Sequence, residues 1–309
     1  GRATMFGDEL TIDHIVWMGD LPTIAERAQR VGVEDVQPRS ALEGVLGKAA
    51  AAGRRVHYLP PYRADTTVEL SDLLGIPVAE VVDRASLEFI RAVIDQRAVK
   101  TEEEIAELDA AVDVSVEMHR AAMAMARPGM LESEIAAEVE RVAVAAGGRP
   151  SFPVIATVHG ETLHNHFHGN TLTEGDLFLL DCGAETAMGY AGDLSSTFPV
   201  SPHFSDRQRL IYEMQLTSYE KAISMLAPGT TNRDVHFAAA RVIAEGMKEL
   251  GLMRGNIDDA LEAGAHAMFF PCGVGHMMGL DVHDMENLGE VYVGYDGQPK
   301  STQLSLIHI

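Results

Sequence analysis

The stretch TEGDLFLLDCGAETAMGYAGDLSSTFPVS (residues 173–201) decides the fold of this chain. Its apolar run DLFLLD (176–181) is typical of a buried strand that ends in an acid, and AGDLSSTFPV (191–200) predicts a second strand. The short, turn-forming GAETAMG between them predicts that the two strands pair as an antiparallel hairpin. Folding of this hairpin would bring the carboxyl groups of Asp181 and Asp193 close together.

Two aspartates held together in a mostly buried sheet indicate a site for a cation. Their negative charges repel, and each carboxylate costs free energy to remove from water. A divalent cation between them relieves both penalties. The alternative is that one aspartate faces solvent or caps a turn, which is the usual role of a lone aspartate at a strand end. The histidine-containing segments elsewhere in the chain favour the metal.

The segment CGVGHMMGLDVHD (272–284) offers imidazole ligands. His276 and His283 stand in a frame of glycines, which lets the backbone approach a ligand closely. On a strand, either histidine could bind a metal through a neutral ring nitrogen. Asp281 and Asp284 flank His283, and we expect them to orient its ring or to change its pKa. The alternative is that both histidines are ordinary core or loop residues.

The segment HGETLHNHFHGN (159–170) contains four histidines within ten residues. The alternate spacing of His164, His166 and His168 would place them on one face of a strand. We expect that face to line the same cleft as the aspartates. A metal site built from these histidines alone is the main rival use of the segment.

The length of 309 residues favours about two domains. Residues 1–84 are expected to form a small α/β unit without a catalytic cluster, with strands over 12–19 and 54–60 and helices over 21–32, 40–53 and 67–75. Residues 85–309 form the expected second domain, which opens on a long helix. Thr101 and Glu104 match a capping box at its start. Its expected apolar face consists of Ile105, Leu108, Val112, Val116 and Met123.

The expected second domain contains an internal repeat. One helix ends at ARPGM (126–130) and another follows it, and the same arrangement recurs at LAPGT (226–230). Each helix pair leads into a segment rich in Gly, Pro and His that we expect to form strands. This pattern indicates a duplicated α+β unit with a cleft between its halves, where histidines from both could meet. Chance recurrence of Pro-Gly helix ends is the alternative.

Composition excludes several classes of function. The chain has 46 acidic against 24 basic residues and a formal net charge of −22, and such a surface repels nucleic acid and anionic membranes. No apolar run approaches the roughly 20 residues needed to span a bilayer. Cys182 and Cys272 form no CxxC pair, so we expect two reduced thiols in a cytoplasmic protein. The sequence begins at Gly1 without an initiator methionine and within what reads as an ongoing segment, so we expect the natural N-terminus to lie upstream.

The phrases LLDCGAE, YAGDLSSTFPVS and GVGHMMGLDVHD resemble the signature segments of the pita-bread metallopeptidases. Within that group they are most similar to aminopeptidase P and prolidase. The resemblance covers about residues 85–300, and the preceding unit resembles the creatinase-like domain of these proteins. It implies an α+β pita-bread fold with a pseudo-two-fold duplicated catalytic domain, preceded by a smaller α/β domain.

The resemblance also implies roles for individual residues. The family binds metal through two Asp, one His and two Glu. Carried over by motif, Asp181, Asp193 and His276 would be metal ligands. His283 would contact the substrate and stabilise the transition state, and His164 would lie near the scissile peptide bond.

The activity implied is hydrolysis of the N-terminal Xaa-Pro bond of a peptide with proline second. A metal-activated water would attack that bond, with two Mn²⁺ ions as cofactor and Co²⁺ or Zn²⁺ as substitutes. Homo-oligomers are common in the family, and we allow for one here.

The resemblance fails at the end of the chain. GYDGQPKSTQ (294–303) and LSLIHI (304–309) contain no EPG-type segment, so we expect a chain truncated before the two glutamate ligands and therefore impaired. Glu286 and Glu290 do not match those ligand positions. Three alternatives stay open: an Xaa-Pro dipeptidase, a non-catalytic pita-bread binding protein, and a metal-free relative of creatine amidinohydrolase.

Overall fold

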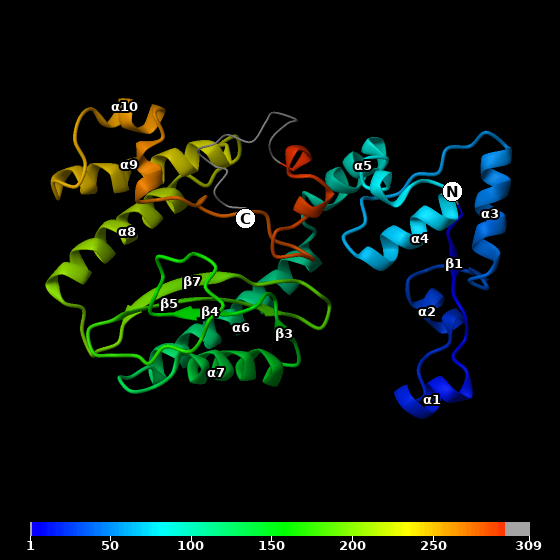
Figure 1. Cartoon of the computed structure of the whole chain (residues 1–309), viewed down its shortest axis with the longest axis horizontal. Helices are drawn as coiled ribbons and strands as arrows, with labels where there is room; N and C mark the ends of the chain where they lie inside the picture. The colour runs from blue at the N-terminus through cyan, green and yellow to red at the C-terminus, as the bar shows by residue number, and fades with distance from the viewer. Residues whose placement is uncertain (1, 294–309) are drawn as a thin grey trace. The chain divides into compact units, whose positions relative to one another are not determined.

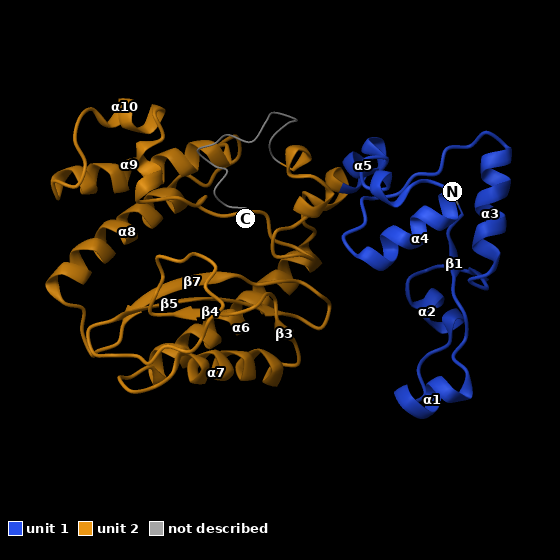
Figure 2. Ribbon diagram, in the orientation of Figure 1, with its two compact units in different colours: residues 1–93 blue, residues 94–309 orange. Residues whose placement is uncertain are grey.

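The computed structural model describes residues 2–293 and divides the chain into two compact units, residues 1–93 and 94–309 (Figure 2). The division falls within helix α5 (Leu87–Arg97), a few residues after the expected boundary at 84/85. The tail segments 294–303 and 304–309, on which the expected truncation rests, lie outside the described residues.

The first unit is an α/β unit with a two-stranded parallel sheet, in which β1 (Thr4–Phe6) pairs with β2 (Asp35–Gln37). The expected helices over 21–32, 40–53 and 67–75 are confirmed as three of its helices. The helices of this unit are α1 (Ile12–Met18), α2 (Ile24–Arg30), α3 (Ala41–Ala51), α4 (Ala64–Leu74) and the short 3-10 helix η1 (Val78–Glu80).

Two strands expected in this unit are wrong. Residues 12–19 form helix α1, because the Thr11 hydroxyl and backbone N–H bond His14 Nδ1 and cap the first turn. Residues 54–60 form no strand. There the Tyr58 carbonyl accepts from Ser86 N, and its hydroxyl donates to the Val81 carbonyl, so these contacts replace a ladder partner.

The second unit places a three-stranded antiparallel sheet above two helices (Figure 1). The sheet order is β4-β5-β7, and β3 pairs with β6 beside it. The strands are β3 (Arg149–Pro150), β4 (Ile155–Thr157), β5 (Leu177–Cys182), β6 (Ala184–Glu185) and β7 (Leu194–Pro199). The hairpin expected over 176–200 is confirmed as β5–β7, with Asp181 opposite Ser195.

Helices α6 (Glu102–Met125) and α7 (Glu132–Ala145) supply the other half of the core. The capping box of Thr101 and Glu104 is confirmed. The expected apolar face of α6 is wrong: Ile105, Val116 and Met123 are exposed. The buried positions are instead Ala111, Ser115, Met118, His119 and Ala122. Three of these five residues are small, and Ser115 Oγ contacts β6 directly by accepting from Ala184 N at 2.9 Å.

The core of this layer is built by large side chains from both helices and strands, including Phe178, Leu180, Met118 and Ile135. Each such side chain stabilises the fold by roughly 1.5–3 kcal/mol when fully buried. This packing fixes the hairpin against α6 and α7, and the hairpin carries both candidate aspartates.

The second helix pair confirms the helical part of the expected internal repeat. Helices α8 (Asp206–Ser224) and α9 (Asn232–Glu249) pack together, with α10 (Ile257–Glu262) against α9. The segment after them departs from the expectation. Residues 269–285 form turns, flanked by the 3-10 helices η2 (Ala265–Met268), η3 (Glu286–Leu288) and η4 (Glu290–Tyr292). Backbone bonds recorded for the loop run mostly within it, as from Asp284 N to the Met277 carbonyl, and the Gly279 carbonyl accepts from Ala191 N.

Candidate functional site

The β5–β7 hairpin brings Asp181 and Asp193 together as the sequence predicts. Asp181 lies in β5, and Asp193 directly precedes β7. Burial, and then the negative charge of Asp193, raise the pKa of Asp181 to about 7, against a partial lowering by a hydrogen bond from Ser195. Its Oδ1 atom is buried and has no hydrogen-bond partner among the described residues. The pair therefore carries an unrelieved electrostatic cost.

Two glycines allow the hairpin to pack closely against itself and against α6. A Cβ atom on Gly183 would lie 1.8 Å from the Gly192 carbonyl oxygen, and one on Gly192 would lie 2.4 Å from Ser115 Oγ. Ser151 ties the same turn by donating from its hydroxyl to the Gly192 carbonyl at 2.7 Å. The glycines between the aspartates are thus required for close packing.

His276 reaches the aspartate pair from the other half of the unit. Its Nε2 lies 3.0 Å from Asp193 Oδ2, and its Nδ1 lies 3.1 Å from the Met277 carbonyl oxygen. Burial lowers the pKa of His276, but the bonds to these two acceptors outweigh it and the pKa is raised. Since Asp193 and the Met277 carbonyl are both acceptors, the two contacts favour a ring with a proton on each nitrogen.

His283 stacks on His276, with ring centroids 3.8 Å apart and the planes inclined by 17°. Its Nδ1 lies 3.0 Å from Glu286 Oε2, which makes Glu286 the carboxylate that orients it. Asp281 and Asp284, which the sequence suggested for this role, form ion pairs with Arg97 and Lys100.

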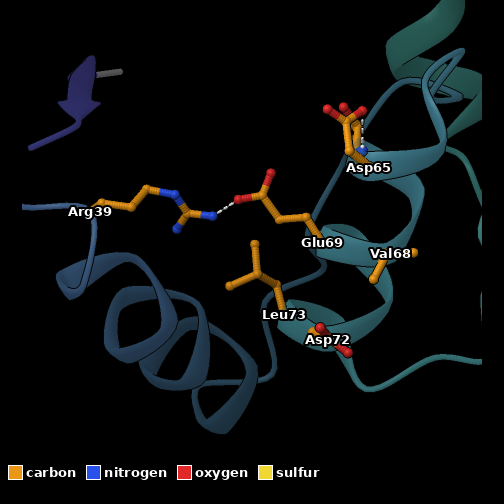
Figure 3. Close-up of a pocket in the computed structure, with 7 residues that line it drawn as sticks. Arg39, Asp65, Val68, Glu69, Asp72 and Leu73 are labelled. Carbon is orange, nitrogen blue, oxygen red and sulfur yellow. Dashed lines mark hydrogen bonds and ion pairs between the residues drawn. The ribbon is translucent and has the colours of Figure 1, made fainter. Parts of the chain in front are cut away.

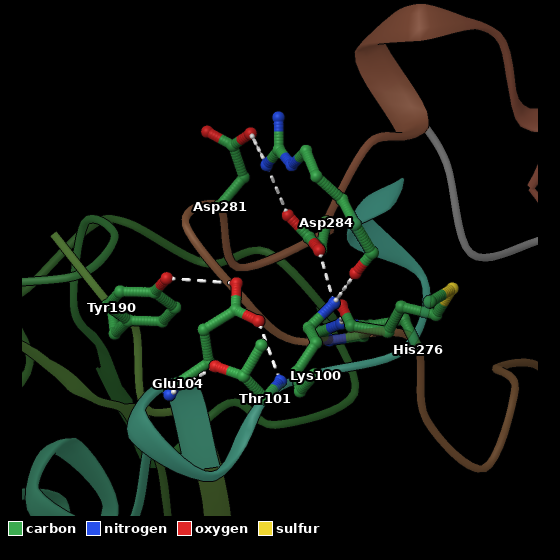
Figure 4. A network of polar contacts seen from close by, with 9 residues as sticks. Lys100, Thr101, Glu104, Tyr190, His276, Asp281 and Asp284 are labelled. Atoms are coloured by element: carbon green, nitrogen blue, oxygen red, sulfur yellow. Dashed lines mark hydrogen bonds and ion pairs between the residues drawn. The ribbon is translucent and has the colours of Figure 1, made fainter. Parts of the chain in front are cut away.

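Asp284 is 1% exposed and lies between two cations (Figure 4). Its Oδ1 lies 2.6 Å from Arg97 Nη2, and its Oδ2 lies 2.6 Å from Lys100 Nζ. Asp281 meets the same Arg97 at 3.5 Å. These ion pairs fix the end of the loop that carries both histidines.

A hollow of about 340 Å³ opens over the pair of aspartates. His164, His166 and His283 line it together with Asp181 and Asp193, so the expected convergence of both histidine segments on the aspartates is observed. Phe152, Pro153, Leu280 and Val282 add apolar walls.

The expected strand over the first histidine segment is absent, since residues 161–170 form a turn and an irregular loop. Only part of that segment faces the hollow. His168 Nε2 is instead 3.1 Å from the Val154 carbonyl oxygen, and His159 pairs with Glu161. This arrangement disfavours a site built from histidines alone.

The residues present fit a divalent cation in type and in charge. Asp181 offers a buried oxygen that has no hydrogen-bond partner in the part of the chain that the structure describes, and Asp193 offers a second carboxylate. His276 offers a ring nitrogen that could bind a metal after losing its proton. Across residues 2–293, no cluster of three or more His, Cys, Asp or Glu has its donor atoms set around one point. His276 would have to exchange its bond to Asp193 for one to the cation.

A second hollow, of about 500 Å³, lies in the first unit between the start of α3 and α4 (Figure 3). Arg39 points across it to Glu69 and forms an ion pair. None of the candidate residues lies there, and its polar groups do not converge on one point. Both cysteines are free thiols as expected, although Cys272 is only partly buried.

Comparison with known proteins decides the family. The sequence pattern of metallopeptidase family M24 matches residues 106–304, more than half of the chain. The chain belongs to metallopeptidase family M24. The match covers the hairpin, the histidine loop and the helix pairs of the second unit.

The M24 chain is similar to two curated Xaa-Pro aminopeptidases. That of Escherichia coli (strain K12) is 36% identical over 63% of this chain and 45% of its own length. That of Haemophilus influenzae is 30% identical over 89% of this chain and 63% of its own. The chain therefore spans 45% of the length of the first relative and 63% of the length of the second.

Solved structures give the fold. The low-pH form of aminopeptidase P from E. coli matches with a TM-score of 0.80 at 28% identity, over 94% of this chain and 68% of that one. The Pseudomonas aeruginosa aminopeptidase PepP matches with a TM-score of 0.79 at 28% identity, over 91% and 65%. The α+β pita-bread fold is thus confirmed. Between residues 2 and 293 no helix is both long and apolar enough to cross a membrane.

Proposed function

We propose that this M24 chain belongs to a metal-dependent Xaa-Pro aminopeptidase that hydrolyses the N-terminal bond of peptides with proline second. The observation that carries the proposal is the buried Oδ1 of Asp181, which has no hydrogen-bond partner within residues 2–293 and lies beside Asp193 and His276. The names of the curated relatives from E. coli and H. influenzae support the substrate class.

In this proposal Asp181, Asp193 and His276 hold the cation, with Mn²⁺ as the expected ion and Co²⁺ or Zn²⁺ as substitutes. A bound divalent cation supplies a water of lowered pKa and a positive charge beside the carbonyl oxygen. Ligand sets rich in carboxylate with one imidazole suit Mn²⁺.

The chain's own residues position the peptide. His164 and His283 would donate hydrogen bonds to the carbonyl oxygen as negative charge develops on it, an arrangement that contributes several kcal/mol in enzymes generally. The Glu286 carboxylate lies 3.0 Å from His283 Nδ1, so His283 would need a proton on each ring nitrogen to donate from Nε2 into the hollow as well. The walls of Phe152 and Pro153 suit an apolar proline ring.

The test is calorimetric titration of the 309-residue chain with Mn²⁺, beside the variants Asp193→Asn and Asp206→Asn. Asp206 lies at the start of α8 and outside the hollow, so its variant controls for the lost charge. We expect weak binding of one ion by the parent and the control, and at least about 100-fold weaker binding by Asp193→Asn. Equal affinities in all three chains would refute the proposed ligands.

Turnover is a separate question. Three of the five family ligand positions are matched among residues 1–309, so we expect little cleavage of an Xaa-Pro-Xaa tripeptide with Mn²⁺ present. Robust cleavage would overturn the expected impairment while supporting the substrate class. Binding of neither metal nor peptide would favour a non-catalytic role.

An Xaa-Pro dipeptidase is the second candidate. The curated Xaa-Pro dipeptidase of Rattus norvegicus is 29% identical over 92% of this chain and 59% of its own length. Competition between an Xaa-Pro dipeptide and an Xaa-Pro-Xaa tripeptide for the Mn²⁺-loaded chain separates the two candidates. We expect the tripeptide to bind more tightly. The cytoplasmic location and a homo-oligomeric state also stay predictions, and size-exclusion chromatography with light scattering tests the latter.

A further inference from the structure

Glu132 is a fully buried carboxylate that lies outside the aspartate hollow. It occupies the first position of α7, where the helix dipole favours negative charge. Every contact recorded for its two oxygens is a donor from the segment that carries His164 and His166, or from the end of β4 that leads into it. A buried carboxylate satisfied in this way marks a fixed point of the fold.

The carboxylate closes both ends of the segment 158–170. Its Oε1 accepts from Val158 N at 2.8 Å, at the start of the segment. Its Oε2 accepts from Asn170 N at 3.1 Å and from Asn170 Nδ2 at 2.9 Å, at the end. The backbone N–H of Glu132 donates to the Asn170 carbonyl at 3.0 Å. One side chain therefore fixes the separation of the two ends.

A relay also leads from Glu132 into the middle of the segment. The buried Thr157 hydroxyl donates to Glu132 Oε1 at 3.0 Å. Thr157 Oγ1 in turn accepts from Asn165 Nδ2 at 3.1 Å and from His159 N at 2.9 Å. Asn165 is the residue between His164 and His166, both of which line the hollow.

We propose that Glu132 is a positioning residue, which acts through Thr157 and Asn165 to set His164 and His166 in the hollow. The inference rests on the proposed function for its catalytic meaning. The geometry of the clamp is independent of that function. A glutamate is required here because all the partners of its side chain are donors. A glutamine would place its own N–H₂ donor opposite these donors. An aspartate is one methylene shorter and would not reach both Val158 and Asn170.

The test compares Glu132→Gln and Thr157→Val with the control Glu134→Gln. Glu134 lies in the same helical turn, and its carboxylate accepts from Leu131 N, so its variant removes the same charge without touching the segment. Hydrogen exchange of residues 158–170 and the ring NMR signals of His164 and His166 are recorded for each chain. Binding of an Xaa-Pro-Xaa peptide and of Mn²⁺ is measured in parallel.

In Glu132→Gln we expect exchange within 158–170 to rise about tenfold or more, because at least one charge-assisted bond is lost. Exchange in β5 and β7 should not change. Thr157→Val should shift the His164 and His166 signals while leaving exchange at Asn170 unaltered. Both should weaken peptide binding without changing Mn²⁺ affinity, and Glu134→Gln should behave as the parent.

Unchanged exchange and unchanged histidine signals in Glu132→Gln would overturn the inference. So would a rise in exchange spread equally through β5 and β7, since that result would describe a general loss of structure. If the parent binds no peptide, the proposed function fails, while the exchange and NMR readouts still decide whether Glu132 positions the segment.

Discussion

At the scale of single residues, the candidate site holds two carboxyl groups close together, and a bound cation would relieve their repulsion. The side chain of Asp181 is partly buried beside Asp193, and His276 Nε2 lies 3.0 Å from the Asp193 carboxylate. Folding thus brings together charges that water would separate at lower cost. Groups of shifted pKa cluster most often at functional sites, which agrees with the proposed role of these residues in binding a cation.

The raised pKa of Asp181 predicts how stability depends on pH. Its folded-state pKa is about 7, above its ordinary value of 3.8, so the folded chain holds a proton that the unfolded chain releases. That contribution is complete below pH 4 and is lost as the pH rises through 7. In chelator, we expect Asp181→Asn to melt at the parent's temperature near pH 4 and at a higher temperature at pH 8, as measured by calorimetry.

Added Mn²⁺ should reverse this difference, because the cation stabilises the ionised aspartate in the parent alone. We expect the melting temperature of the parent to rise more at pH 8 than at pH 5, and that of Asp181→Asn to stay nearly constant. Identical profiles for the two chains would contradict the burial of an unrelieved charge at this position.

Sequence motifs predicted the residues that converge at the candidate metal site, but not the residues that hold its loops in place. Asp181, Asp193 and His276 could be predicted because their motifs are local and contain chemically unusual side chains. Arg97 and Lys100 meet Asp284 across more than 180 residues of sequence, and Glu132 reads as an ordinary acid in a first helical turn. Sequence periodicity and motif spacing do not indicate such long-range ion-pair and hydrogen-bond partners, because tertiary packing determines which residues meet.

At the scale of elements, local capping and packing decided where the sequence pattern misled. The β-branched and aromatic residues of 12–18 suggested a strand, yet a cap at Thr11 begins a helix there. The histidine loop of 272–284 is held by ion pairs and turns, so it needs no strand ladder. The β5–β7 hairpin, with its apolar run and short turn, was predictable because it satisfies its own backbone bonds.

The loop 276–284 depends on a glycine that packs against the buried ion pairs. A Cβ atom at Gly279 would lie 2.4 Å from Asp284 Oδ2, whereas one at Gly47 in α3 meets no atom within 4 Å. We expect Gly279→Ala to lower the free energy of unfolding by about 1–3 kcal/mol and to weaken Mn²⁺ binding through displacement of His276. Gly47→Ala should not destabilise the chain. Urea denaturation of both variants provides the measurement, and equal stabilities would exclude a tight fit at Gly279.

Helix α9 and the 3-10 helix η2 each contribute one histidine to a buried pair. His236 and His266 are fully buried, and their four ring nitrogens make no hydrogen bond within residues 2–293. Burial, and then the neighbouring His266, lower the pKa of His236 to about 4. Phe270 stacks on His236 at 5.2 Å, which adds to its apolar surroundings.

A histidine of lowered pKa stabilises the fold above its unfolded pKa, near 6.5, and this contribution is lost as the pH falls toward 4. Removal of the titration by His236→Phe should flatten the acid side of the stability curve by up to about 3 kcal/mol between pH 6.5 and pH 4. The exposed His203→Gln is the control, and urea denaturation followed by circular dichroism is the measurement. An acid limb as steep in His236→Phe as in the parent would place the sensitivity elsewhere.

At the scale of the whole molecule, the two units differ in how much they bury. In residues 2–93 the fully buried apolar side chains are Ala28, Val81 and Ile90, whereas the second unit has a continuous core over its sheet. The side chains of α1 are exposed, with Trp17 at 87%. A two-stranded sheet and short helices without a core are marginally stable on their own.

We therefore expect the first unit to open far more often than the second. Amides of α1, β1 and β2 should exchange with solvent much faster than those of β5 and α7, because local opening needs little apolar surface to be exposed. Hydrogen exchange followed by mass spectrometry measures this difference directly. Added Mn²⁺ should slow exchange in β5 and leave β1 unchanged, since the proposed ligands lie in the second unit alone. Equal protection of both units, lost in a single cooperative step, would contradict the contrast in burial from which this prediction is drawn.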